Sequence, residues 1–226
     1  MSLGNWKAYL FDLDDTLYDE IDFIHSGYRA ASRYLSMKCP EADFQVAYDY
    51  MRGLLETQGR AGVFEKTLAL FNLPYPNLVS SLLRVYRKHR PSIQMTMDDD
   101  LVLDRLMFRE GKRIGIVTDG DREVQENKVY ALNILRHSGA IILTDDLGPG
   151  NGKPSPEGYA IALTELDVKP SDAVYVGNNP TKDFLGARSL GMATVQIDRP
   201  RRMVKYDVPD KRLRADFQIA DLRELL

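Results

Sequence analysis

The sequence predicts an α/β fold: a Rossmann-like, doubly wound parallel sheet that forms a core, with an α-helical cap domain inserted into it. Three observations predict it. Short apolar runs of strand length recur without polar alternation, as expected for strands buried on both faces of a parallel sheet. Amphipathic helical stretches separate the later runs, which indicates right-handed crossovers. One long helical stretch after the first run interrupts this alternation and indicates the insertion.

The core elements follow from these runs in chain order. We expect strands at 8–11, 113–117, 140–143, 173–176 and 193–197, and a last strand at 215–220 before a short helix. Helical periodicity predicts helices at 123–136, 156–166 and 181–190. The stretch 199–214 is rich in basic residues and prolines, so we expect a solvated loop there.

The insertion spans residues 17–90 and is helical throughout. Periodicity predicts helices at 23–34, 44–56, 63–71 and 78–89, with Gly, Pro and Asn in the loops between them. We therefore predict a core formed by residues 1–16 and 91–226 and a small helical cap formed by residues 17–90.

Composition excludes several classes of protein. The 226 residues include 30 basic and 33 acidic ones, a net charge of -3, which argues against a general nucleic-acid partner. No apolar stretch approaches the length of a membrane span, and no secretion signal is evident, so no membrane partner is expected. The single cysteine, Cys39, indicates a reducing compartment, and we expect a cytoplasmic location. The sequence leaves the oligomeric state open.

Two carboxylates follow the first strand. Asp12 and Asp14 are one residue apart, so on an extended chain they point the same way. Two close carboxylates repel each other unless a cation or a shared proton compensates, and Mg²⁺ prefers such hard oxygen ligands. Taken alone, the pair is equally compatible with a turn that caps the next helix.

Polar residues also follow two later strands and one loop. Thr118, Asp119 and Gly120 end the second strand, where a hydroxyl and free backbone N–H groups could hold phosphate oxygens. Lys153 lies in a loop constrained by glycines and prolines and could offset the charge of a phosphate. Asp183 begins a helix after the fourth strand. Each has a simpler structural explanation, but the carboxyl ends of parallel strands converge, and one shared site explains all four features.

These four segments resemble the four motifs of the haloacid dehalogenase superfamily, which consists mostly of phosphatases. The segment 11–17, FDLDDTL, is similar to the first motif; Thr118 with Asp119 and Gly120 resembles the second, Lys153 the third, and residues 177–183 the fourth. The resemblance covers residues 9–197, and the helical insertion lies where the family places a cap.

The resemblance implies roles for these residues. Asp12 would attack phosphorus and form an aspartyl-phosphate, and Asp14 would act as the acid and then the base. Thr118 and the backbone N–H of Asp119 would grip the phosphoryl oxygens, and Lys153 would stabilise the transition state. A carboxylate at position 14 disfavours the dehalogenase branch, which lacks one there.

Mg²⁺ is the cofactor that the resemblance implies, held by Asp12, the backbone carbonyl of Asp14, Asn178 and Asp183. Many relatives carry Asp where this chain has Asn178, so an uncharged amide oxygen replaces a carboxylate. We expect metal affinity to be weaker than in those relatives.

The cap would select the substrate, and His25, Tyr28 and Arg60 are candidates for contacting it. Packing among aromatic residues is the alternative for His25, and exposure to solvent is the alternative for Arg60. We expect a Mg²⁺-dependent phosphatase for a small phosphorylated metabolite of the sugar phosphate, nucleotide or phosphoglycolate type. A phosphomutase of the same superfamily, or a binding or regulatory protein that has lost activity, is the alternative.

Overall fold

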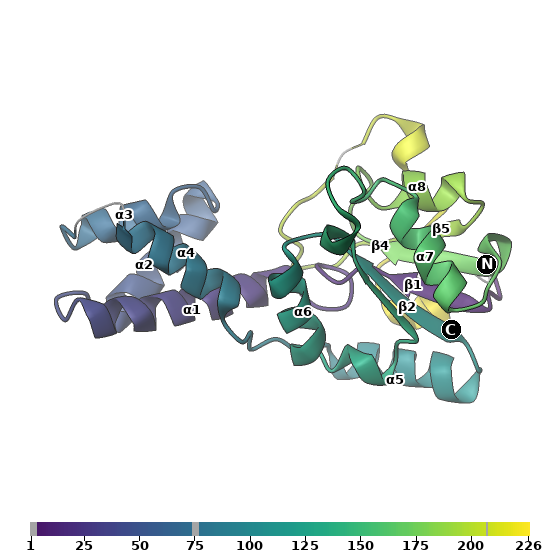
Figure 1. Ribbon diagram of the computed structural model, residues 1–226, viewed down its shortest axis with the longest axis horizontal. Helices are drawn as coiled ribbons and strands as arrows, with labels where there is room; N and C mark the ends of the chain where they lie inside the picture. Colours follow the sequence, from purple (N-terminus) through teal and green to yellow (C-terminus); the bar gives the residue numbers. More distant parts are fainter. Residues whose placement is uncertain (1–3, 74–76, 207) are drawn as a thin grey trace. The chain divides into compact units, whose positions relative to one another are not determined.

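The structure, a computed structural model, describes residues 4–73, 77–206 and 208–226. The chain divides into two compact units. One unit contains residues 1–21 and 93–226, and the other contains residues 22–92. Figure 1 shows the helices of the second unit in blue and violet, and the sheet of the first unit with its surrounding helices.

A six-stranded, all-parallel sheet forms the centre of the first unit, which confirms the predicted fold class. The strands are β1 (Ala8–Phe11), β2 (Arg113–Thr118), β3 (Ala140–Leu143), β4 (Ala173–Gly177), β5 (Ala193–Ile197) and β6 (Phe217–Ile219). Their order is β3-β2-β1-β4-β5-β6. The first strand is therefore central, and the chain crosses from one side of it to the other between β3 and β4, which creates the switch point where such sheets bind ligands.

Alternate residues of β1 face opposite sides of the sheet. Ala8 and Leu10 belong to a buried cluster with residues of α7 (Glu157–Glu165) and α8 (Phe184–Ser189). Tyr9 and Phe11 point to the other side, where their rings stack with centroids 6.5 Å apart. Both sets are buried, as the apolar run predicts. The segment α5 (Met97–Asp104) packs against the C-terminal turn Leu222–Leu225.

Two features of the core differ from expectation. The segment 97–109, for which no element was predicted, forms α5 followed by a π-helical turn, Arg105–Arg109. The predicted helix 123–136 is instead α6 (Arg122–Ala131) and a 3-10 turn, because Asn133 adopts a left-handed conformation with φ of 52°.

The second unit contains the four helices that periodicity predicts. They are α1 (Glu20–Lys38), α2 (Phe44–Gln58), α3 (Val63–Leu70) and α4 (Asn77–Lys88). Aromatic rings fill its interior: Tyr86 lies 5.7 Å from Phe23 and 5.9 Å from Phe64, centroid to centroid. The missing side chain of Gly27 makes room for Tyr86, since a Cβ there would lie 2.4 Å from the ring. Within the described ranges, no helix combines the length and apolarity needed to cross a bilayer.

Candidate active site

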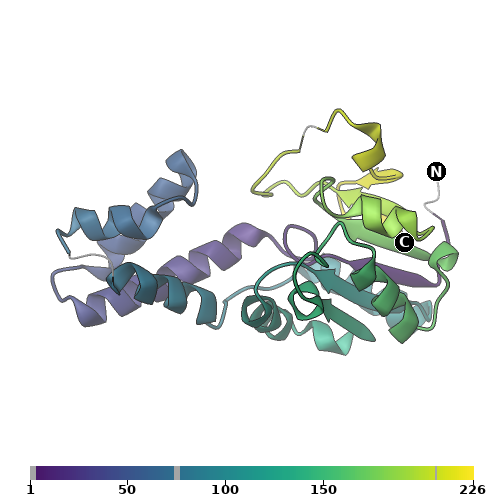
Figure 2. The ribbon, with the colours of Figure 1, turned by 45° about the horizontal axis from the view of Figure 1, so that its top comes forward.

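The carboxyl ends of three neighbouring strands bring the predicted residues together. Phe11, the last residue of β1, lies beside Ile116 of β2 and Val176 of β4. Asp12 therefore leaves the sheet between the ends of those two strands, and its N–H donates to the Val176 carbonyl at 2.9 Å. The segments that end at Thr118 and Gly177 flank it on either side. Figure 2 shows this edge of the sheet from a second direction.

Asp12 and Lys153 form a buried ion pair. The Nζ of Lys153 lies 2.9 Å from Oδ1 of Asp12 and 2.7 Å from Oδ1 of Asp183. Burial raises the pKa of Asp12 to about 7, opposed by Lys153 and reinforced by Asp183 and Asp14. Burial also lowers the pKa of Lys153, but its two carboxylate partners outweigh that effect and hold the pKa well above its usual range. Lys153 is therefore a fixed positive charge beside Asp12.

A buried tyrosine is a further hydrogen-bond partner of the Lys153 ammonium. The hydroxyl of Tyr175, on β4, accepts a hydrogen bond from Lys153 Nζ at 3.1 Å and donates one to the Val117 carbonyl at 3.0 Å. The Lys153 loop is also fastened at its backbone, because Asp119 Oδ1 accepts from the Lys153 N–H at 3.0 Å. Thr144 donates to the same oxygen at 2.7 Å. The side chain of Asp119 thus positions Lys153.

Asp14 is held by a different cation. Lys128 Nζ lies 2.8 Å from both oxygens of Asp14, Gln125 Nε2 donates to Oδ2 at 3.2 Å, and the Tyr18 hydroxyl donates to Oδ1. Burial raises the pKa of Asp14, but the charge of Lys128 and these hydrogen bonds outweigh burial and lower it. Gln125 also donates to the Thr118 hydroxyl at 2.6 Å, so one amide joins two of the predicted site residues.

Two of the predicted metal ligands, Asp183 and Asn178, differ in whether their side-chain oxygens already accept hydrogen bonds. Asp183 is fully buried; Oδ1 accepts from Lys153, and Oδ2 accepts from the Asn179 N–H at 2.7 Å. A Cβ on Gly177 would lie 2.4 Å from Oδ2, so the glycine allows this close approach. Asn178, only 8% exposed, has a side chain for which no hydrogen bond is found within the described parts of the chain. Its amide oxygen is therefore the more available of the two.

No ready-made metal cluster accompanies these groups. Across residues 4–73, 77–206 and 208–226, no set of three or more His, Cys, Asp or Glu side chains is arranged to hold a metal ion. The donor set that the resemblance implies is of another kind: the carboxylates of Asp12 and Asp183, one backbone carbonyl and one amide oxygen, all hard oxygens of the type that Mg²⁺ accepts.

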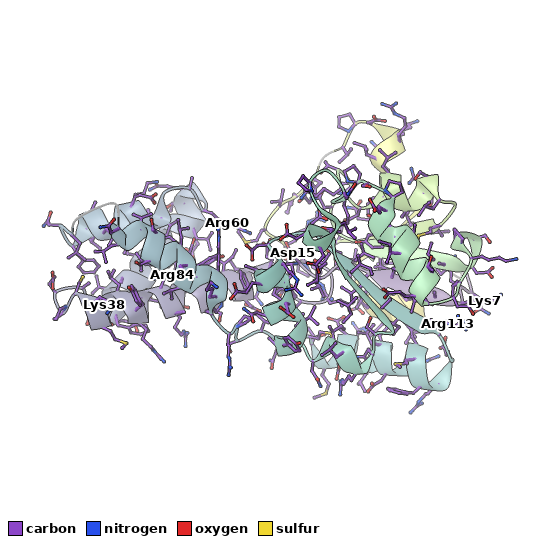
Figure 3. All side chains as sticks on the ribbon, viewed as in Figure 1. Lys7, Asp15, Lys38, Arg60, Arg84 and Arg113 are labelled. Atoms are coloured by element: carbon purple, nitrogen blue, oxygen red, sulfur yellow. The ribbon has the colours of Figure 1, made fainter. Side chains whose placement is uncertain are left out.

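Asp15, labelled in Figure 3, has a structural role beside these residues. Its Oδ1 accepts from the Glu20 N–H at 2.8 Å and its Oδ2 accepts from the Met203 N–H at 3.0 Å. Arg199 donates to the Thr16 carbonyl at 2.8 Å. These bonds fasten the first motif to the loop after β5.

The remaining predicted residues, His25 and Arg60, lie in the second unit. His25 is half-buried in α1, and Arg60 is exposed in the loop between α2 and α3, where Figure 3 labels it. Burial raises the pKa of Tyr28, and the charge of Arg60 opposes this rise. Contact between these residues and a substrate stays a prediction.

A sizeable cavity lies away from these residues. It has a volume of about 920 Å³, lies at the amino ends of the strands and is lined in part by Lys7, Arg113 and Asp172. Lys7 pairs with Asp172 at 2.8 Å, and Arg113 donates to backbone carbonyls. Figure 3 shows Lys7 and Arg113 at the edge of the sheet remote from Asp15. We assign the site by its chemistry, at the opposite edge.

Sequence reasoning missed four side chains of this site: Tyr18, Gln125, Lys128 and Tyr175. Gln125 and Lys128 are polar residues spaced three apart on a helix, and only the structure shows that both are buried. Tyr18 follows Asp14 by four residues, and Tyr175 lies within an apolar strand. Nothing in these patterns distinguishes them from ordinary surface or core residues.

Known proteins resemble this chain in both sequence and fold. The family described as haloacid dehalogenase-like hydrolase matches residues 6–191. Glyceraldehyde 3-phosphate phosphatase of Methanopyrus kandleri is 31% identical over 97% of this chain and 95% of its own length. Phosphoserine phosphatase of Thermus thermophilus is 32% identical over 52% of this chain and 44% of its own.

Solved structures give the same result. A HAD phosphatase from Thermococcus onnurineus is 28% identical, with a TM-score of 0.60 over 97% of this chain and 95% of the other. A 2-haloacid dehalogenase from Pseudomonas syringae has a TM-score of 0.65 at 24% identity, over 97% of this chain and 96% of the other, which shows a shared fold.

Proposed function

Because this chain belongs to the haloacid dehalogenase-like hydrolase family, we propose that it is a Mg²⁺-dependent phosphatase that hydrolyses a small phosphorylated metabolite through Asp12. One observation carries the proposal. Asp12 lies at the carboxyl end of the central strand with one oxygen paired to the buried ammonium of Lys153, and no hydrogen bond to its other oxygen is found among the described residues. This is the arrangement of a carboxylate nucleophile beside a fixed positive charge.

Charge balance supports a divalent cation. The carboxylates of Asp12, Asp14 and Asp183 bring three negative charges, and Lys128 and Lys153 bring two positive ones. A bound phosphate monoester adds about two more negative charges near neutral pH. Asp12, the backbone carbonyl of Asp14 and the amide of Asn178 are the groups that would hold Mg²⁺, which would neutralise the phosphoryl oxygens. Asp183 supports these ligands by its contact with Lys153. If Asp183 bound the ion directly, the ion would replace one of the two hydrogen bonds that Asp183 accepts.

The reaction then proceeds in two displacements. An oxygen of Asp12 forms a bond to phosphorus while the bond from phosphorus to the leaving oxygen breaks, and Asp14, after it takes up a proton from solvent, gives that proton to the leaving oxygen. Water next attacks phosphorus, Asp14 takes a proton from the water, and the bond to Asp12 breaks to release phosphate. Thr118 and the backbone N–H of Asp119 hold the phosphoryl oxygens, and Lys153 stabilises their charge.

The substrate class follows from the relatives and from the second helical unit. The relatives named above act, by their names, on glyceraldehyde 3-phosphate and phosphoserine, both small metabolites. We propose that residues 22–92 form a cap that closes over the site, excludes water and contacts the substrate through His25 or Arg60. We further propose a cytoplasmic location, in keeping with the single cysteine.

A panel of phosphorylated metabolites, assayed for released phosphate with Mg²⁺, tests the function. Turnover abolished by Asp12→Asn and by chelation of the metal is the expected result. Isomerised phosphate ester without free phosphate, dependent on a bisphosphate activator, would identify a phosphomutase instead. Absence of turnover across the panel would indicate a binding protein.

A further inference from the structure

The buried tyrosine on β4 connects the Lys153 ammonium with the end of β2. We propose that Tyr175 is a positioning residue that holds this ammonium in register with Thr118 and Asp119, so that its charge meets the phosphoryl oxygens in the transition state. This role rests on the proposed function and goes beyond it, because Tyr175 lies outside the four motif segments and the rate of phosphoryl transfer would depend on it.

The two partners of the Tyr175 hydroxyl allow only one placement of its hydrogen. An ammonium can only donate and a carbonyl can only accept, so the hydroxyl accepts from Lys153 Nζ at 3.1 Å and donates to the Val117 carbonyl at 3.0 Å. The tyrosine is completely buried, and a buried polar group left without its partner is costly. The hydroxyl is therefore a bridge of fixed direction between the ammonium and β2.

This bridge crosses the central strand on the face that carries Asp12. Tyr175 lies in register with Leu10 of β1, and β1 separates β4 from β2. Asp12 follows Leu10 by two residues, so its side chain leaves the chain on the same face as those of Leu10 and Tyr175. The tyrosine thus spans three strands on the face where Asp12 and Lys153 lie 2.9 Å apart.

Both ends of Lys153 are tied to the end of β2. Its backbone N–H donates to Asp119 Oδ1 at 3.0 Å, and its ammonium is joined to the Val117 carbonyl through Tyr175. Thr118, which lies between Val117 and Asp119 in the chain, is the residue predicted to hold the phosphoryl oxygens. The lysine charge is therefore placed relative to the phosphoryl site at both ends of the residue.

The position of this charge matters most in the transition state. Three side-chain oxygens lie within 3.1 Å of Lys153 Nζ, those of Asp12, Asp183 and Tyr175. In the ground state the Asp12 carboxylate neutralises part of the ammonium charge. As Asp12 bonds to phosphorus, its negative charge passes to the phosphoryl oxygens, where a fixed ammonium compensates it without having to reorganise. Loss of the Tyr175 hydroxyl would leave one ammonium hydrogen without an acceptor and let the ammonium move.

Tyr175→Phe removes the hydroxyl and keeps the contacts of the ring, which has Lys153 Nζ 5.6 Å from its centroid and the Tyr159 ring at 4.8 Å. The experiment measures kcat and KM on the best ester of the metabolite panel, and the inhibition constants of phosphate and orthovanadate, all with Mg²⁺. Vanadate accepts a fifth oxygen from the attacking carboxylate and so resembles the transition state, whereas phosphate resembles the ground state. We expect kcat and vanadate affinity to fall by about 10- to 100-fold, and KM and phosphate affinity to change by less than about 3-fold.

Tyr159→Phe is the matched control. Its hydroxyl is equally buried, but it donates to the backbone carbonyl of Asp183, at 2.8 Å, rather than contacting Lys153. We expect this variant to have a lower free energy of unfolding and an unchanged ratio of the two inhibition constants. A second Tyr175 variant carries 4-aminophenylalanine, whose amino group can still donate to Val117 but is a much weaker acceptor for Lys153. It should reproduce the selective loss, and it decides the matter if Tyr175→Phe does not fold.

Equal weakening of vanadate and phosphate in the Tyr175 variants would indicate general damage to the site and would overturn the proposal. The same selective loss in Tyr159→Phe, or an unchanged kcat in the Tyr175 variants, would also overturn it. Failure of the wild-type protein to release phosphate from any ester would instead refute the proposed function, and this measurement precedes any comparison of variants.

Discussion

The pairing of burial with negative charge at Asp12 has a measurable consequence for stability. In the metal-free protein the folded-state pKa of Asp12 is about 7, above its ordinary value of 3.8. The folded protein therefore binds more protons than the unfolded chain between about pH 4 and pH 7, and stability from this group falls as pH rises through that window. Asp12→Asn removes the titration but keeps the shape of the side chain.

The magnitude follows from the size of the shift. A difference of about three pKa units, at about 1.4 kcal/mol each, gives an upper limit of about 4 kcal/mol. In EDTA at pH 8 we expect Asp12→Asn to be more stable than the wild type by about 2–4 kcal/mol, while at pH 4 the two should differ little. The same substitution abolishes activity, because the nucleophile is lost.

Urea denaturation at pH 4, 6 and 8 measures this difference in the free energy of unfolding. With an unchanged m-value, the difference appears as a shift in the midpoint urea concentration. Adding Mg²⁺ should stabilise the wild type at pH 8 and not the variant, because the ion binds the charged carboxylate. Glu165→Gln, at an exposed position, is the control for removing one acidic charge. A variant less stable than the wild type at pH 8 without metal, or a difference independent of pH, would refute the reasoning.

Three further predictions follow from single contacts. Gly186→Ala places a Cβ 2.4 Å from the Pro154 carbonyl oxygen and should cost about 1–3 kcal/mol of unfolding free energy, whereas Gly53→Ala, in an open helical position, should stabilise by about 0.5–1 kcal/mol. Asn178→Asp adds a charge to the predicted metal ligands and should tighten Mg²⁺ in an activity titration; unchanged or weaker affinity would count against this ligand set. Arg199→Leu breaks a buried pair with Asp99 at 2.9 Å and should destabilise by about 3–5 kcal/mol in thermal or urea unfolding, with a loss below about 1 kcal/mol contradicting its burial.

The predicted strands were found because each buried strand is a continuous apolar run, and the end of such a run is visible in the sequence. Asp12 and Thr118 could be assigned to one edge of the sheet for that reason alone, since parallel strands end at the same edge. The helix after β4 was predicted to start at residue 181, but α8 begins at Phe184. The reason is tertiary: Asp183 turns inward to Lys153 and to the Asn179 N–H, which keeps the preceding residues in a loop.

What the sequence determined by itself is the fold and the convergence of the motif residues, because both depend on local patterns and on the geometry of parallel strands. What only the tertiary structure decided is which partner each charge takes. Lys128 and Asp14 are 114 residues apart, and no periodicity relates them. Lys128 pairs with Asp14, and Lys153 donates to the Tyr175 hydroxyl, because a buried charge is stable only beside a compensating polar or charged group. Tertiary packing decides which group that is.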